Sequence, residues 1–336
     1  MKKLIVLAVS LMIILTSIPS SVAAPTNQGL EWNVSAGDKF YYNVVLFDST
    51  QTNPYGVTDA EEDIYVNVTL APSAIPDDVT DPSELPFVSC GFYYLNGTID
   101  TVLGSILNLG SFGMVKPIGN WSLMSELYQM IDSFFLYDAN VTIDVDTWLH
   151  WGFTMNSTYM ITPTGFDPFE ADVRISSSFL KSDGVLADFL YTINNASSID
   201  NSLVIQVEAR RDGTPPVVSH PADVTILSGT DGNIIEWNAS DTSPAGYSIE
   251  VDGVEVKKGF WNSTSENVTL TLDTLDVGEH ECTVYFYEAS GLSTTDTVVV
   301  TVTGPGQNTL NQYLPIILIA GGIVVVLIAI VIIRRK

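Results

Sequence analysis

The sequence is short of basic residues, histidine and cysteine. Its 336 residues include 13 Lys and Arg against 39 Asp and Glu, with only 3 His and 2 Cys. A surface of this charge repels nucleic acid, so no nucleic-acid partner is expected. No two of the histidines stand at the spacing of a metal-binding pair, and there is no HExxH, GxSxG, Walker or dinucleotide-binding glycine motif. Carboxylates are abundant, but no pair stands out as the acid and base of a glycosidase. We therefore expect no catalytic residue and no enzyme.

The two ends of the chain carry its long apolar runs. Residues 1–24 combine a basic start, an apolar middle and a small-residue exit, which is the pattern of a secretory signal peptide. Residues 313–333 have the length of a transmembrane helix, and the run 316–333 contains no charge. The basic tail 334–336 places the C-terminus in the cytoplasm. The sequence thus predicts a single-pass type I protein of the cell membrane with an extracellular N-terminal part.

Between these ends the chain is strongly acidic. All 39 acids but only 8 of the cations lie there, for a net charge of −31. Such a surface would stay soluble in concentrated salt, which screens its self-repulsion, or it would attract divalent cations. Both explanations stay open. Asp144 and Asp146 share one face of an expected strand and are the candidate Ca²⁺ ligands, with a further acidic cluster at 59–63. No twelve-residue calcium loop is present, so solvated acidic faces and no cofactor are the default expectation.

Segments rich in Pro and Gly divide the exported part. The boundary at 209–216 ends in two prolines, which cannot serve a central strand, and a second break lies at 304–308. We therefore expect an extracellular domain at 25–211, a second domain at 217–303 and a stalk at 304–312.

The second domain shows short alternating runs separated by turn signals, including Asp-Gly at 231–232 and 252–253. Strands are expected at 223–227, 233–238, 247–251, 254–257, 268–272, 282–287 and 297–302, which describes a β-sandwich with Trp237 in its core. The runs "GTDGNIIEWNASDTSPAGYSIEVDG" and "VGEHECTVYFYEASGLSTTDTVVVTV" resemble the immunoglobulin-like modules of archaeal surface proteins, and are similar to hyalin-repeat and polycystic-kidney-disease-type modules. The resemblance implies an extracellular spacer or adhesion module.

The first domain is also rich in apolar and alternating runs. They lie at 40–46, 64–70, 87–95, 141–145, 148–155, 171–180, 185–193 and 203–207 and predict a mostly antiparallel sheet. Residues 121–137 place seven apolar side chains on one helical stripe, with Asn120 or Ser122 as the cap, so an amphipathic helix packed on the sheet is expected. The phrases "WNVSAGDKFYYNV" and "SDGVLADFL" resemble archaeal surface proteins and, more distantly, lipoprotein-carrier half-barrels in which a curved sheet wraps a helix. No ligand is carried over from that resemblance.

Asn-x-Ser/Thr sites are the most abundant motif. Ten are present where random order of the same composition gives roughly 3.5, and the signal peptide would bring them to the glycosylating enzyme. They stand at Asn33, Asn67, Asn96, Asn120, Asn140, Asn156, Asn195, Asn238, Asn262 and Asn267. We predict N-glycosylation at several of them.

The alternation of side chains in strands gives an independent test of four of these sites. At Asn67 the expected apolar face is Ile64, Val66, Val68 and Leu70, which leaves the Asn and its Thr outward. The neighbours of Asn140, Asn238 and Asn267 alternate in the same way, so all four acceptors are expected on the solvent face. Ordinary polar residues would produce the same alternation, but they would not produce the excess of sites.

Cys90 and Cys282 lie on the apolar faces of strands in different expected domains. A disulfide needs Cα atoms within about 7 Å, so buried free thiols are favoured, although an exported protein allows the bridge between the two. Cys282 stands where immunoglobulin folds often carry one of their paired cysteines, but no partner stands near Trp237. The disulfide of the resembled family is therefore not expected.

Two functions remain open. One is an N-glycosylated protein of the cell surface that acts in adhesion or envelope structure, with an extracellular protein or glycan as its partner and the membrane as its anchor through residues 313–333. The other is an extracellular ligand-binding module, in which the sheet and the helix at 121–137 enclose an apolar pocket lined by Trp148, Trp151 and Phe153.

Overall fold

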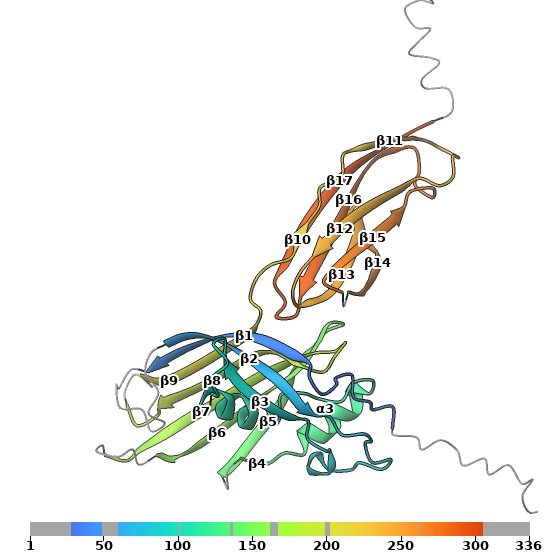
Figure 1. The fold of residues 1–336 in the computed structure, drawn as a ribbon. Helices are drawn as coiled ribbons and strands as arrows, with labels where there is room; N and C mark the ends of the chain where they lie inside the picture. Colours follow the sequence, from blue (N-terminus) through green and yellow to red (C-terminus); the bar gives the residue numbers. More distant parts are fainter. Residues whose placement is uncertain are drawn as a thin grey trace, which may run out of the picture.

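The computed structural model describes residues 28–48, 60–100, 102–134, 137–161, 167–198, 202–261 and 263–304. They form two β domains joined end to end (Figure 1). One core cluster contains buried residues from Leu30 to Ala209 and the other contains buried residues from Ile226 to Val302. The prediction of a mainly β chain is confirmed. The expected signal peptide (1–24), transmembrane helix (313–333), tail (334–336) and stalk beyond residue 304 lie outside the described residues. Within those residues, no helix is both long and apolar enough to cross a membrane.

The first domain is built on one antiparallel sheet of nine strands in the order β3-β2-β1-β9-β8-β7-β6-β5-β4. Each of the eight expected runs overlaps one of these strands. The strands are β1 (Lys39–Asp48), β2 (Ala60–Leu70), β3 (Ser89–Tyr94), β4 (Ser133–Phe134), β5 (Tyr137–Asp146), β6 (His150–Ile161), β7 (Phe169–Leu180), β8 (Leu186–Asn195) and β9 (Ser202–Arg211). The expected inward side chain of Leu70 is wrong, because a register shift after Val68 leaves Leu70 61% exposed.

Two helices and one short turn of helix pack with this sheet. They are α2 (Leu103–Gly110), α3 (Trp121–Gln129) and the 3-10 turn η1 (Pro82–Glu84). The α3 helix begins as expected, with the Asn120 side chain accepting from Leu123 N at 3.1 Å. Its expected end at residue 137 is wrong. Ser133–Phe134 instead forms β4, which pairs with the start of β5, so sheet pairing overrides the local helical stripe there.

The second domain is a two-layer sandwich. Its sheets have the orders β10-β12-β15 and β11-β17-β16-β13-β14. Trp237 is fully buried in the core, as expected. All seven expected strands are present, together with the short β10; they are β10 (Val217–Val218), β11 (Val224–Leu227), β12 (Ile234–Ser240), β13 (Pro244–Val251), β14 (Val254–Phe260), β15 (Ser265–Thr271), β16 (Gly278–Glu288) and β17 (Ser293–Thr303).

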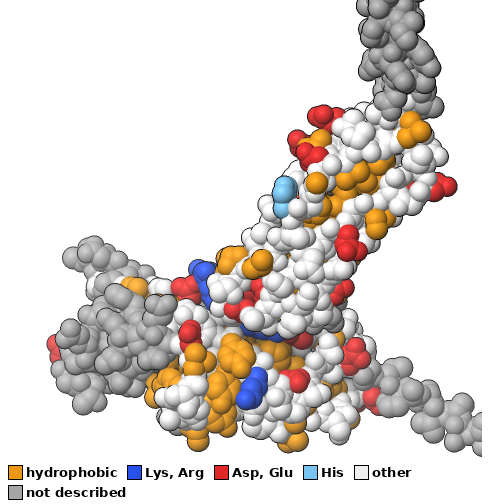
Figure 2. Space-filling model, turned by 45° about the horizontal axis from the view of Figure 1, so that its top comes forward, with side chains coloured by type: hydrophobic (Ala, Val, Ile, Leu, Met, Phe, Trp, Pro, Cys, Tyr) orange, Lys and Arg blue, Asp and Glu red, His pale blue; other side chains and the backbone are white. Residues whose placement is uncertain are grey.

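The junction between the domains has its own small apolar cluster. Leu149 and Leu180 of the first domain pack with Ala245 and Ala289 of the second, and Trp148 lies against them. His150 Nε2 donates across the junction to Ala289 O at 2.7 Å. These contacts fix the second domain against the β5–β6 turn. Acidic side chains are scattered over the face shown in Figure 2, where basic ones are few.

Candidate functional site

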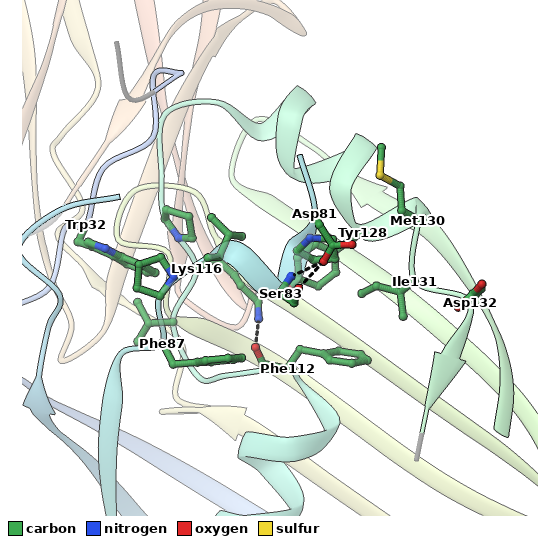
Figure 3. A pocket seen from close by; sticks show the side chains of 15 residues that line it. Trp32, Asp81, Ser83, Phe87, Phe112, Lys116, Tyr128, Met130, Ile131 and Asp132 are labelled. Carbon is green, nitrogen blue, oxygen red and sulfur yellow. Dashed lines mark hydrogen bonds between the residues drawn. The ribbon is translucent and has the colours of Figure 1, made fainter. Parts of the chain in front are cut away.

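A pocket of about 340 Å³ opens on the first domain between the end of α3, η1 and the segment that links α2 to α3. Its lining is largely apolar and aromatic, and Trp32 lies on one side with Met130 and Ile131 on the other (Figure 3). Phe87 and Met130 are 64% and 58% exposed, whereas Tyr128 is buried. The pocket therefore has an aromatic floor and an exposed apolar rim.

Lys116 is the cation among the lining residues, and only 2% of it is exposed. Its Nζ donates to Ser111 O at 2.8 Å and to Phe112 O at 2.7 Å, and the second of these bonds is drawn in Figure 3. Both carbonyls belong to the C-terminal end of α2, where the helix dipole favours a cation. Burial lowers the pKa of this amine well below its ordinary value. Because the amine is bound to two backbone carbonyls, it caps the C-terminal end of α2.

Two backbone features bring Lys116 to this place. Phe112 and Gly113 have φ angles of 54° and 105°, which end α2 and turn the chain back toward the sheet. Gly184, with φ 75°, lies against the next segment so closely that a Cβ would stand 1.9 Å from Lys116 O. Its carbonyl accepts from Lys116 N at 2.8 Å. The turn before β8 thus holds the pocket segment in position.

Carboxylates stand among the residues that line the pocket. Asp81 accepts from Ser83 Oγ at 2.6 Å and from Ser83 N at 2.8 Å, and these hydrogen bonds lower the pKa of its carboxyl group. Asp132 is exposed at the end of the pocket away from Trp32, next to Ile131 (Figure 3). A lining of this kind suits a small ligand with an apolar body and a neutral or cationic group, rather than an anion.

The three aromatic residues expected to line a pocket do not do so. Trp151 and Phe153 are completely buried beneath α3 as part of the core. Trp148 lies at the domain junction, with ring centroids of Phe260 and Tyr287 each 6.0 Å away. The reason is the turn between β5 and β6, which places Trp148 outside the sheet while the alternation of β6 directs the other two inward. The expected pocket of these residues is therefore wrong, and the pocket beside Lys116 is a different one.

A polar hollow of about 650 Å³ lies at the domain junction. Arg211, which is 6% exposed, donates from Nη1 to Asp183 Oδ2 at 2.7 Å. Burial disfavours the charge of this guanidinium, but Asp183 and other partners raise its pKa. Nearby, Glu288 is fully buried and burial raises its pKa to about 6. The junction thus contains both an apolar contact and buried ionisable groups, which come from both domains.

Most of the ten sequons lie where a sugar could extend into solvent. Asn33, Asn96, Asn140, Asn156, Asn238 and Asn267 are exposed, and Asn67, Asn120 and Asn195 are half-buried. Asn262 lies outside the described residues. In the four tested strands the acceptor faces away from the core, as expected: Val66, Val141, Trp237 and Val268 are buried beside them. Asn120 is held by two hydrogen bonds, because its amide nitrogen donates to Gln28 O at 2.7 Å while its oxygen caps α3.

The candidate metal ligands have other partners. Asp144 accepts from Thr154 Oγ1 at 2.5 Å, and Asp146 forms an ion pair with Lys181 at 2.5 Å. Of the acidic cluster at 59–63, Asp63 is exposed and the preceding acidic side chains lie outside the described set. Among the residues that the structure describes, no group of three or more His, Cys, Asp or Glu could hold a metal ion.

The two cysteines are free thiols in separate cores. Cys90 packs against the core of the first domain, and Cys282 is fully buried in the second. Burial raises the pKa of each thiol to about 11. Neither is therefore a thiolate at neutral pH.

The sequence matches no protein-family model and no curated protein. Its structure is similar to a fibronectin(III)-like module of CbhA from Clostridium thermocellum, with 15% identity, 26% of this chain and 96% of that chain covered, and a TM-score of 0.21. It is also similar to a protein from Corynebacterium diphtheriae described as membrane anchored, with 9% identity, 80% of this chain and 59% of that chain covered, and a TM-score of 0.20. A third similar structure is the extracellular domain of a hybrid two-component system from B. thetaiotaomicron, with 9% identity, 73% and 42% covered, and a TM-score of 0.22. This chain therefore spans about half the length of the last two proteins.

Proposed function

We propose that this chain is a single-pass, membrane-anchored, N-glycosylated cell-surface protein that acts in adhesion or envelope structure. The observation that carries the proposal is the placement of the strand sequons at Asn67, Asn140, Asn238 and Asn267. Each acceptor faces away from a core that its own strand neighbours fill. Sugars on that side would cover the sheets without disturbing their packing.

The packed junction supports a display role for the second domain. Because Trp148 and Leu149 pack against the sandwich, the first domain is held at a fixed angle on its neighbour. The segment at 313–333 then anchors the assembly in the membrane. The partner is an extracellular protein or glycan that is neutral or basic, or that is joined through cations, since the surface of this chain is strongly acidic.

The first test is the mass of the full chain purified from its membrane, before and after enzymatic removal of N-linked glycans. We expect a loss of mass at several sites, and an unmodified mass would contradict the glycoprotein proposal. Protease treatment of intact cells tests location separately. We expect the two β domains to be cleaved from the outside, and their complete protection would contradict surface display.

A second candidate function is ligand binding by the first domain, which the 340 Å³ pocket favours. Trp32 Nε1 is buried beside it with no hydrogen-bond partner among the described residues, so a ligand acceptor could satisfy it after a small movement of the ring. Titration with an apolar fluorophore tests this. Phe87→Asp at the rim should weaken binding by about tenfold, while Met160→Asp, at a similarly exposed site on β6, should leave it unchanged. Equal effects would refute the site.

A further inference from the structure

Four of the acceptor asparagines form two directly opposed pairs. Asn140 on β5 is the register partner of Asn156 on β6, and Asn238 on β12 is the partner of Asn267 on β15. Directly opposite side chains in an antiparallel pair have Cβ atoms only about 4.5–5.5 Å apart. All four residues are exposed, so both members of a pair point into the same solvent layer.

This spacing accommodates two Asn side chains but crowds two oligosaccharides, because a glycan is much bulkier than the amide that carries it. If the first glycan is attached after the strands pair, it covers the opposite amide. If both are attached before pairing, the two sugars must be forced together when the sheet closes. Either order disfavours a folded protein that carries both.

The hydrogen bonds distinguish the members of the second pair. Asn238 Nδ2 donates to Asn267 Oδ1 at 2.7 Å and lies 3.4 Å from Ser265 Oγ, so both of its hydrogens have acceptors. Asn267 Nδ2 has one acceptor, Glu236 Oε1, at 3.3 Å. Moreover, β12 lies between β10 and β15, while β15 is the edge of its sheet. A sugar is accommodated with less loss on Asn267.

The first pair shows the same asymmetry. Asn156 is opposed on its other side by Arg174 of β7, so it has neighbours on both flanks. Asn140 lies one residue past the last backbone hydrogen bond on that side of β5, from Ala139 N to Asp132 O at 2.8 Å, and β4 supplies no register partner for it. In each pair, therefore, one acceptor has paired or hydrogen-bonded strand neighbours on both flanks, and the other, which we call the edge residue, has a register partner on one flank only.

We propose that each pair carries a single N-linked glycan, on the edge residues Asn140 and Asn267. The inference rests on the proposed glycosylation. The sugar donor is an oligosaccharide joined through phosphate to a lipid. In the transfer, the amide nitrogen forms a bond to the anomeric carbon, the bond from that carbon to the phosphate oxygen breaks with its electrons going to the phosphate, and the amide gives up one proton to solvent.

Site-resolved mass spectrometry of the full chain, produced in a host that attaches N-linked glycans, tests the proposal. We expect Asn140 and Asn267 to be occupied and the occupied fractions within each pair to sum to no more than one. A sum above one requires doubly modified molecules and would overturn the proposal, as would preferred occupancy of Asn156 or Asn238. Glycans at other sites with both members of a pair bare would also overturn it. A chain without any glycan would overturn the proposed function as well, so the two failures are distinguishable.

Two variants make the competition visible. Asn267→Gln removes the edge acceptor, and Thr269→Ala removes its sequon while keeping Asn267 itself. In both, occupancy at Asn238 should rise to the level that Asn267 had. Asn96→Gln, at an exposed turn without an opposed acceptor, is the control and should leave Asn238 unchanged. No rise at Asn238 in either of the first two variants would show that the members of the pair do not compete.

Discussion

Glu288 at the domain junction makes the stability of this protein depend on pH in a direction opposite to that of most carboxyl groups. The residue ends β16 and is fully buried. Its carboxylate accepts from Ser290 N at 2.8 Å, from Leu292 N at 2.9 Å and from Ser290 Oγ. Burial is the largest effect on this group and raises its pKa from 4.5 to about 6, although these hydrogen bonds oppose the shift.

The sign follows from proton binding. The folded protein holds the Glu288 proton more tightly than the unfolded chain, so the stabilising contribution is full below about pH 4.5 and is lost as the pH rises through about 6. The difference between a pKa of 4.5 and one of about 6 corresponds to about 2 kcal/mol of stability. Other carboxyl groups add their own pH dependence, so the effect must be isolated by difference.

Glu288→Gln supplies that difference, because the amide has the same shape and does not titrate. We expect the free energy of unfolding of the native protein, measured by urea denaturation from pH 4 to 8, to fall by about 2 kcal/mol relative to the variant as the pH rises. Asp252→Asn is the control of opposite sign. Hydrogen bonds from His280 and from Glu281 N lower the pKa of Asp252, so its stabilising contribution is lost as the pH falls. A flat difference between native protein and Glu288→Gln would refute the assignment.

Three further predictions concern the junction and the pocket. Trp148→Ala should lower the free energy of unfolding by about 2 kcal/mol, which is about half the cost of truncating a fully buried Trp, because Trp148 is half-buried. It should also separate the unfolding of the two domains in calorimetry, and a single unchanged transition would contradict the packed junction. Burial lowers the pKa of Lys116, so below about pH 10 the folded protein binds fewer protons than the unfolded chain and its stability should rise with pH. Lys116→Met should abolish this rise, and an unchanged dependence of urea denaturation on pH would argue against it. Gly184→Ala should lower the melting temperature far more than Gly213→Ala. Both residues have similar φ angles, but only the first would place a Cβ against Lys116 O, and equal losses would refute the close approach.

The strands were predictable because the alternation of apolar and polar residues that marks them lies within each strand's own sequence. One side of each sheet is buried, so the residues alternate, and the alternation at Asn238 or Val268 is visible without any tertiary information. The α2 helix was not predicted, because its own sequence carries weak local signals. Its sequence LGSILNLG contains two glycines, and no side chain of its own first residues caps it. The cap is Asp100, whose carboxylate accepts from Gly104 N at 2.5 Å.

The pocket could not be read from the sequence, because its wall is assembled from distant segments. Trp32, Phe87, Lys116 and Tyr128 belong to four parts of the chain that meet only after the sheet closes. The signal available in the sequence was Lys116 itself, which is one of 8 cations outside the apolar ends and lies in an otherwise apolar stretch. A solitary lysine of that kind is equally compatible with an exposed position, so the three-dimensional fold was needed to decide.

The pairing of β1 with β9 bears on the export that we propose for this protein. The first domain consists of two meanders, β1 to β3 and β4 to β9, and only the contact of β1 with β9 joins them into one sheet. Tyr42 pairs with Ile64 of β2 on one side, but its partner on the other side is Arg211, the last residue of β9. If the chain is exported N-terminus first, as proposed, the side of β1 that faces β9 stays open until β9 has emerged, and such open edges recruit wrong partners. A pause in translocation before residue 211 would be more dangerous to this domain than a pause at any point after it.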